Sequence, residues 1–196
     1  MQYKYDKVNL GSNDDHKPGY INVDQSLPAD IVHDLSIKWP FDDNSLSEII
    51  AHDVFEHIDN PCYRGNKGKI WCFNEAYRCL KPGGILDLIV PTVDGYGAFQ
   101  DPTHVSFWTP NDRFYFCAER DPITHKYKIW EERVRFGCDP KLDYERLSVI
   151  PPLQRFGGHY GITGLFGISS PGDWRHSNYI RGEKAWKVFA KLEALK

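Results

Sequence analysis

The sequence predicts an α/β protein with a mostly parallel sheet, and two patterns carry this prediction. Residues 7–24 read as a hydrophobic strand, a turn at Gly11, a short polar loop and a second strand that ends at Asp24. Residues 80–84, LKPGG, are typical of a helix end, and they lead into an apolar run at 85–90. Strands that are buried on both faces of a parallel sheet are continuously apolar, so we expect 85–90 at the centre of the sheet.

The polar loop between the first two strands is short. Only residues 11–19 connect them, whereas a parallel crossover normally takes a dozen or more residues and usually a helix. We therefore expect an abbreviated first crossover. The other expected elements are short strands at 31–33 and 46–51, a helix at about 68–80, an antiparallel edge pair of strands at 127–136 and 147–153, an irregular loop at 157–174 and a terminal helix at 185–195.

The length and composition are ordinary for one globular domain, which we expect to span residues 1–196. The formal net charge of −3 argues against a protein that wraps nucleic acid by bulk electrostatics. Basic residues near the C-terminus are expected on the solvated face of the terminal helix. The sequence shows no apolar leader or membrane-length run, and its five cysteines form no C-x-x-C pair. We expect a cytoplasmic protein with reduced thiols and no membrane partner.

The turn at Gly11 favours a nucleoside ligand but not a dinucleotide. A glycine lets the backbone pass close to a ligand, and a carboxylate at the end of the next strand, here Asp24, can accept both hydroxyls of a ribose. A dinucleotide needs G-x-G-x-x-G, because its pyrophosphate lies against bare amides at a helix N-terminus. In this chain Gly11 is followed by Ser-Asn-Asp-Asp, and two acids at that place disfavour a pyrophosphate.

Four blocks of the chain, NLG…GYINVD, DL…PF.DNS, EHI and LKPGG, together resemble class I S-adenosylmethionine-dependent methyltransferases. The resemblance covers residues 7–91 well and 92–116 loosely. It implies a Rossmann-like methyltransferase sheet and S-adenosylmethionine as cofactor, whose sulfonium and ammonium charges suit an acidic loop. The family usually has a second glycine in the first turn, where this chain has Ser12 and Asn13. The residues implied at the cofactor are Gly11, Ser12 and Asn13 along the methionine part, Asp24 at the ribose, Asp34 and Leu35 at the adenine, and His52 and Asp53 beside the methyl group.

The methyl acceptor is expected beyond the carboxyl ends of the fourth and fifth strands, at loops near 92–116 and 154–180. Histidine suits the deprotonation of a hydroxyl near neutral pH. We expect His104 to be the base, with His57 as the second candidate and Asp101 as the orienting carboxylate. No metal is expected, because H-E-x-x-H is absent and the spacing H-x-x-x-E-H misses the inverted zinc motif by one residue.

These observations predict methyl transfer to a hydroxyl of a sugar-like or small-molecule acceptor. The N/D-P-P-Y/F block of exocyclic-amine methyltransferases and the Pro-Cys nucleophile of cytosine C5 enzymes are absent, so DNA bases are disfavoured as acceptors. The alternative is a catalytically degenerate module that binds S-adenosylmethionine and acts through a partner protein. Its support is the missing second glycine and the short first crossover. The acceptor atom and the oligomeric state stay open.

Overall fold

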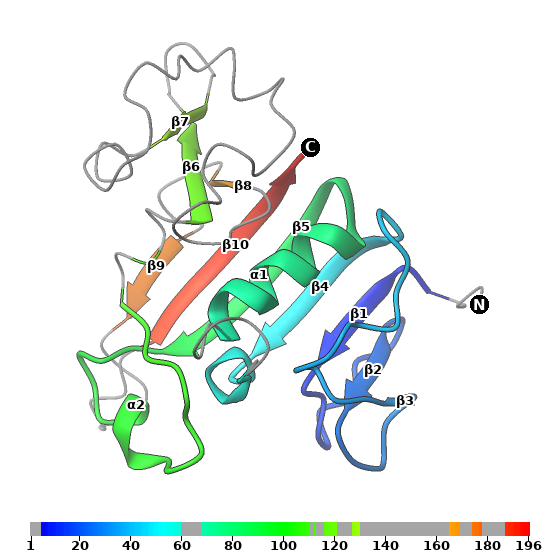
Figure 1. The fold of residues 1–196 in the computed structure, drawn as a ribbon, viewed down its shortest axis with the longest axis horizontal. Helices are drawn as coiled ribbons and strands as arrows, with labels where there is room; N and C mark the ends of the chain where they lie inside the picture. Colours follow the sequence, from blue (N-terminus) through cyan, green and yellow to red (C-terminus); the bar gives the residue numbers. More distant parts are fainter. Residues whose placement is uncertain are drawn as a thin grey trace.

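The structure, a computed structural model, describes residues 5–59, 68–109, 112, 116–120, 127–129, 165–168, 174–177 and 187–196. Its strands form one sheet in the order β3-β2-β1-β4-β5-β10-β8-β6-β7, with β9 paired to β10 (Figure 1). The strands are β1 (Lys7–Leu10), β2 (Ile21–Asp24), β3 (Ile31–Val32), β4 (Leu46–His52), β5 (Leu80–Pro91), β6 (Cys117–Arg120), β7 (Tyr127–Ile129), β8 (Leu165–Ile168), β9 (Trp174–Ser177) and β10 (Lys187–Leu195). The helices are the 3-10 turn η1 (Phe55–His57), α1 (Gly68–Cys79) and α2 (Gly97–Gln100).

The first five strands of the chain are parallel. Leu10 of β1 lies opposite Val23 of β2 and Ala51 of β4, and Ala51 lies opposite Leu88 of β5. The carboxyl ends of these strands therefore meet at one edge of the sheet. The predicted α/β class with a mostly parallel sheet is confirmed, and so is the central position of the apolar strand β5.

The abbreviated first crossover is also confirmed, since residues 11–20 between β1 and β2 contain no helix. A buried pair of asparagines holds this loop. Asn9 donates from Nδ2 to Asn22 Oδ1 at 3.2 Å and to the Asp15 carbonyl at 2.8 Å, and Asn22 Oδ1 accepts the Lys17 amide at 2.9 Å. Side-chain amides thus satisfy the loop backbone that a crossover helix would have satisfied internally.

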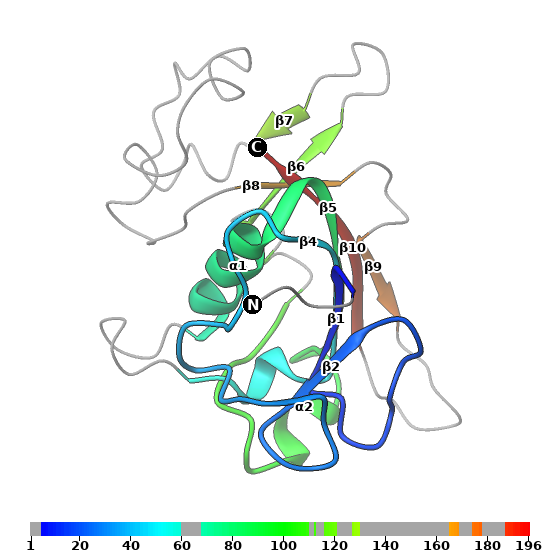
Figure 2. The same cartoon turned by 90° about the vertical axis from the view of Figure 1, so that its right-hand side faces the viewer.

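One face of the sheet packs against α1, which lies on one side of the sheet in Figure 2. Alternate residues of β4, β5 and β10 are buried there in a core with Phe55 and Phe73. The opposite face carries polar pairs: an ion pair of Lys7 with Glu48 at 2.8 Å and a contact of His52 Nε2 with Asp87 Oδ1 at 3.0 Å. Within the described ranges no helix is long and apolar enough to cross a membrane.

The predicted terminal helix at 185–195 is wrong, because residues Lys187–Leu195 form the strand β10. It pairs antiparallel with β5 along seven positions, from Lys187 opposite Pro91 to Glu193 opposite Ile85. Its buried and partly exposed residues alternate, as in a strand that packs one face on a core. The many good helix formers in this segment favoured the helix, and tertiary pairing overrides that weak preference. The basic residues here therefore belong to a sheet and not to a helix face.

The edge of the sheet also differs from expectation. The antiparallel edge pair is β6 with β7, in which Ala118 lies opposite Ile129. Only the start of the expected strand at 127–136 lies in the described part, and the expected strand at 147–153 lies outside it. The expected irregular loop at 157–174 contains the strand β8 (Leu165–Ile168), which pairs parallel with β6 and antiparallel with β10.

Three cysteines in the described residues, Cys72, Cys79 and Cys117, are buried free thiols. Burial raises the pKa of Cys79 to about 12, so this thiol stays protonated at neutral pH. Cys62 and Cys138 lie outside the described residues.

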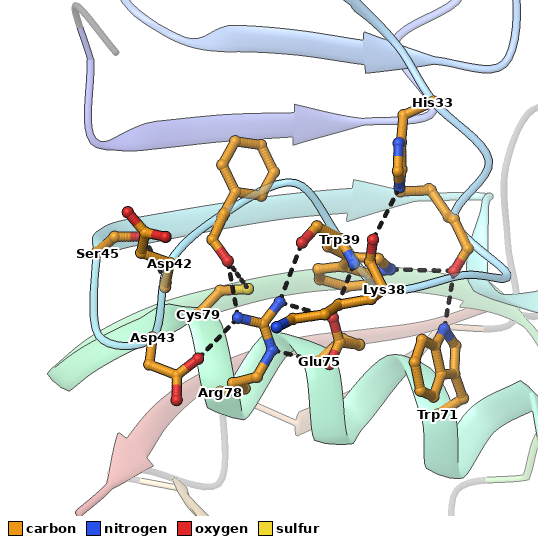
Figure 3. Close-up of polar contacts among 12 residues, drawn as sticks. His33, Lys38, Trp39, Asp42, Asp43, Ser45, Trp71, Glu75, Arg78 and Cys79 are labelled. Atoms are coloured by element: carbon orange, nitrogen blue, oxygen red, sulfur yellow. Dashed lines mark hydrogen bonds and ion pairs between the residues drawn. The ribbon is translucent and has the colours of Figure 1, made fainter. Parts of the chain in front are cut away.

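A buried ion pair on α1 holds the segment that leads into β4 (Figure 3). Arg78 donates to both oxygens of Glu75, at 2.9 and 2.7 Å, and also to Asp43 at 2.8 Å. The same guanidinium donates to the carbonyls of Trp39 and Phe41, and Glu75 accepts the Trp39 amide at 2.8 Å. Because the Glu75 side chain is only 7 % exposed, removing these partners would leave a buried polar group unsatisfied.

We predict that Arg78→Ala lowers the free energy of unfolding by about 3–5 kcal/mol, because it leaves the buried Glu75 carboxylate without its cation. Urea denaturation measures this loss. The matched control is Lys81→Ala, which breaks the pair of half-exposed side chains Lys81 and Asp6 and should cost about 0–1 kcal/mol. Equal losses in the two variants would show that the Arg78 network does not support the fold.

Candidate functional site

The turn after β1 and the acid at the end of β2 come together as predicted. The Ser12 amide donates to the Val23 carbonyl at 3.0 Å, and the Asn13 amide donates to Asp24 Oδ2 at 2.9 Å. Oδ1 of Asp24 accepts the amide and the hydroxyl of Ser26, at 3.1 and 3.0 Å. Burial raises the pKa of Asp24, but the hydrogen bonds from Asn13 and Ser26 outweigh it and hold that pKa below its ordinary value. Asp24 is therefore ionised, as an acceptor of two hydroxyls must be.

Gly11 adopts a φ of +62°, and Val54, which follows β4, packs directly on it. A Cβ at Gly11 would lie 2.6 Å from Val54 Cγ2. The first turn thus needs glycine for its own packing against the end of β4 as well as for its backbone conformation. Asn13, in the place of a family glycine, also has a positive φ, of 40°, which asparagine tolerates.

Asp34 and Leu35 follow β3, but they differ in accessibility. Asp34 is exposed, and its Oδ1 accepts the Ser36 amide at 2.8 Å. Leu35 is buried in the core, and its carbonyl accepts the indole N–H groups of Trp39 and Trp71 at 3.0 and 2.9 Å. Asp34 therefore has a side chain that a ligand can reach, whereas Leu35 anchors the loop.

His52 and Asp53 lie at the end of β4, and each is already paired. His52 Nε2 lies 3.0 Å from Asp87 Oδ1 on the face of the sheet away from α1. Asp53 has a φ of 52°, and its carboxylate accepts a hydrogen bond from Lys187 Nζ at 2.5 Å. The sequence analysis did not find Lys187, because it placed this residue on a terminal helix.

The three residues predicted at the acceptor form one cluster. The rings of His57 and His104 pack edge to face with centroids 4.6 Å apart. Asp101 Oδ2 lies 3.9 Å from His104 Nε2. Thr103 links the group, because its Oγ1 lies 2.9 Å from His57 Nδ1 and 2.6 Å from Asp101 Oδ1. Burial and the neighbouring His104 lower the pKa of His57, which favours the neutral ring.

Glu56 is a member of this cluster that the sequence analysis did not predict at the acceptor. Its side chain is 1 % exposed, and its Oε1 lies 4.0 Å from His104 Nε2. Burial raises the pKa of Glu56 to about 8. Its carbonyl accepts the amides of Val105 and Ser106 at 2.9 and 3.1 Å, which ties η1 to the loop that carries His104. The sequence signal that could have identified Glu56 is its position directly before His57 in the EHI block.

Side-chain oxygens without partners mark the same edge of the sheet. Among the described residues, four buried side-chain oxygens have no hydrogen-bond partner: Ser12 Oγ, Glu56 Oε2, Asp59 Oδ1 and Thr92 Oγ1. Ser12 follows β1, Glu56 and Asp59 follow β4, and Thr92 follows β5. Buried polar groups are nearly always satisfied, so their concentration beyond the strand ends indicates a place where a ligand supplies partners.

No family model matches the chain, and no curated protein matches it. Solved structures do match. S-adenosylmethionine-dependent methyltransferases of Methanosarcina mazei and Archaeoglobus fulgidus are 16 % and 12 % identical, with TM-scores of 0.48 for both; the matches cover 99 % and 97 % of this chain and 94 % and 86 % of theirs. A chain from the complex between the Haloferax volcanii Trm112 methyltransferase activator and the putative methyltransferase is 22 % identical, with a TM-score of 0.33. This match covers 44 % of the present chain and 45 % of the length of the matched one.

We predict that Gly11→Ala lowers the free energy of unfolding by about 1–3 kcal/mol through overpacking against Val54, in addition to the strain of a positive φ. Thermal or urea denaturation measures the loss. Gly19→Ala is the matched control, since Gly19 also has a positive φ, of 83°, but nothing lies within 4 Å of a Cβ placed there; it should lose only the strain, about 1–2 kcal/mol. If Gly11→Ala is no worse than Gly19→Ala, the contact with Val54 does not require glycine.

Proposed function

We propose that the chain binds S-adenosylmethionine at the carboxyl edge of β1, β2 and β4 and transfers its methyl group to an oxygen of a sugar-like or small-molecule acceptor. The observation that carries the proposal is the arrangement of two groups at one sheet edge. An ionised Asp24 lies beside the Gly11–Asn13 turn, and the cluster of His57, Asp101 and His104 lies beyond β4 and β5.

The residues of the first turn fit a cofactor that is cationic and has no phosphate. Asp24 is ionised, and Asn13 and Ser26 each donate to one of its two oxygens, so the carboxylate is held in place and ribose hydroxyls would use its remaining lone pairs. The exposed Asp14 favours positive charge and opposes a pyrophosphate, whereas Asp15 already pairs with Lys17 at 2.8 Å. S-adenosylmethionine supplies an electrophilic methyl group, and the protein's part is to align it with the acceptor.

On the acceptor side, an imidazole Nε2 with a free lone pair can take the proton of a hydroxyl. His104 remains the proposed base, with His57 second and Asp101 as the orienting carboxylate. Its support is that His104 Nδ1 lies 3.0 Å from the Ala98 carbonyl, which leaves Nε2 as the ring atom facing the cluster.

The rival proposal is a cofactor-binding module that acts through a partner protein. It draws support from two contacts at the proposed cofactor site: Val54 packs on Gly11, and Lys187 donates a hydrogen bond to the Asp53 carboxylate. Incubation with S-adenosylmethionine and pools of hydroxyl acceptors separates the two, with S-adenosylhomocysteine and the mass gain of one methyl group as readouts. Binding without turnover on any acceptor pool would favour the rival, and tight NAD binding without a response to the methyl donor would overturn both.

We predict that Asp24→Ala weakens S-adenosylhomocysteine binding about ten- to a hundredfold, because charge-assisted hydrogen bonds to the ribose are each worth about 1.5–3 kcal/mol. Titration calorimetry measures the change. Asp6→Ala is the control: a hydrogen bond from Lys81 likewise lowers the pKa of Asp6, but Asp6 precedes β1, at the opposite edge of the sheet from Asp24, and its loss should leave affinity unchanged. An unaltered dissociation constant in folded Asp24→Ala would make Asp24 purely structural.

We predict that His104→Gln reduces methyl transfer about 10²- to 10⁴-fold while S-adenosylhomocysteine affinity stays within a factor of about two. Glutamine keeps much of the bulk and hydrogen bonding but does not take up a proton. Initial rates with saturating cofactor, together with calorimetry on the same variant, test both statements. Full activity in His104→Gln and in His57→Gln would mean that neither ring is needed, and the proposal of an oxygen acceptor would fail.

A further inference from the structure

Glu56, His57 and His104 bring three potential metal ligands together. One ligand atom of each lies within 4.8 Å of the other two. The first two residues belong to η1, and His104 comes from the loop after α2. The cluster lies at the edge of the sheet where the unpartnered buried oxygens gather.

The hydrogen bonds of both rings determine which nitrogen carries a proton. His104 Nδ1 lies 3.0 Å from the Ala98 carbonyl, which can only accept, so Nδ1 carries the hydrogen. Thr103 donates its hydroxyl hydrogen to Asp101 at 2.6 Å, so at His57 Nδ1, 2.9 Å away, the same oxygen accepts. In both neutral rings Nε2 therefore presents a lone pair. Metal-binding histidines are oriented in the same way, with the other N–H bonded to a carbonyl or a carboxylate-linked group.

The third ligand is a buried carboxyl group with one oxygen that lacks a partner. Glu56 Oε2 is buried without a hydrogen bond, and the whole side chain is 1 % exposed. A buried carboxylate is costly unless a cation or hydrogen-bond donors compensate it. The backbone of Glu56 is held by Val105 and Ser106, so the carboxylate is kept beside the two imidazoles.

We propose that Glu56, His57 and His104 bind a divalent transition-metal ion such as Zn²⁺, with Ala98, Thr103 and Asp101 orienting the two rings. Two imidazoles and one carboxylate are a ligand set that holds such ions and leaves a coordination position open. Bond lengths of about 2.0–2.2 Å require the ligand atoms to move somewhat closer than they lie here.

The inference stands whether or not the chain transfers methyl groups. If the chain both transfers methyl groups and binds a metal ion, the two functions compete for His104 Nε2, because one lone pair cannot bind a proton and a metal ion at the same time. In the metal-loaded protein an acceptor hydroxyl would bind at the open position, where a metal ion lowers the pKa of its ligand, and His104 would act as a ligand instead of a base.

Calorimetric titration of the chelator-treated full chain with Zn²⁺ tests the proposal, and Mg²⁺, which prefers oxygen ligands, is the metal control. We expect one Zn²⁺ site that His57→Ala and His104→Ala each weaken about 100-fold or more, and that Thr103→Val weakens about 10- to 100-fold by releasing the His57 ring. His16→Ala, at an exposed histidine outside the cluster, should bind as the parent does.

The ligand types are checked with Co²⁺ in place of Zn²⁺. The absorption spectrum should show nitrogen and oxygen ligands without a thiolate charge-transfer band, and Zn²⁺ should raise the melting temperature of the parent but not of His57→Ala. Absence of Zn²⁺ binding, a thiolate spectrum, or equal affinity in the parent and in folded His57→Ala and His104→Ala would each overturn the proposal. If the parent protein binds Zn²⁺ but transfers no methyl group to any acceptor, the proposed function fails and the proposed metal site stands.

Discussion

The Glu75 carboxylate is the group on which the arrangement of this molecule depends. It is buried on α1, so it must be paired, and the partners that satisfy it come from α1 itself and from the segment between β3 and β4. Arg78 extends the pairing to the carbonyls of Trp39 and Phe41. Because leaving a buried charge unpaired is costly, the segment before β4 cannot leave α1 without a penalty. This attachment holds β4 between β1 and β5.

The position of β4 in turn determines the candidate site. Parallel pairing brings the ends of β1, β2, β4 and β5 to one edge, so that Val54 covers Gly11 and η1 lies beside them. The antiparallel β10 begins at this edge, which explains why Lys187 reaches Asp53. Only the side of the sheet with α1 is packed by a helix in the described part of the chain, and the other side carries the polar pairs of Lys7 with Glu48 and of His52 with Asp87. The residues of the candidate site are thus concentrated at the carboxyl ends of the parallel strands.

Much of the first half of the fold was predictable because its signals are local. A glycine with positive φ, an acid at a strand end and LKPGG after a helix each act within a few residues of their own position, and β1, β2, β4 and α1 lie close to the expected ranges. The prediction for the terminal segment was wrong because its structure depends on a distant strand and not on local signals. Its helix-forming residues become a strand because β5 offers a long partner, and pairing between segments so far apart outweighs local preference.

The sequence by itself determined the α/β class, the short first crossover and the proximity of Gly11, Asn13 and Asp24, since neighbouring strands and a tight turn leave little choice of geometry. Only the tertiary structure decided that Glu56 is buried beside His57 and His104. The motif search required metal ligands at fixed spacing on one helix, whereas these come from a short turn and a distant loop. They meet because the Glu56 carbonyl accepts hydrogen bonds from the backbone amides at 105–106. These are long-range hydrogen bonds, and no local residue pattern predicts them.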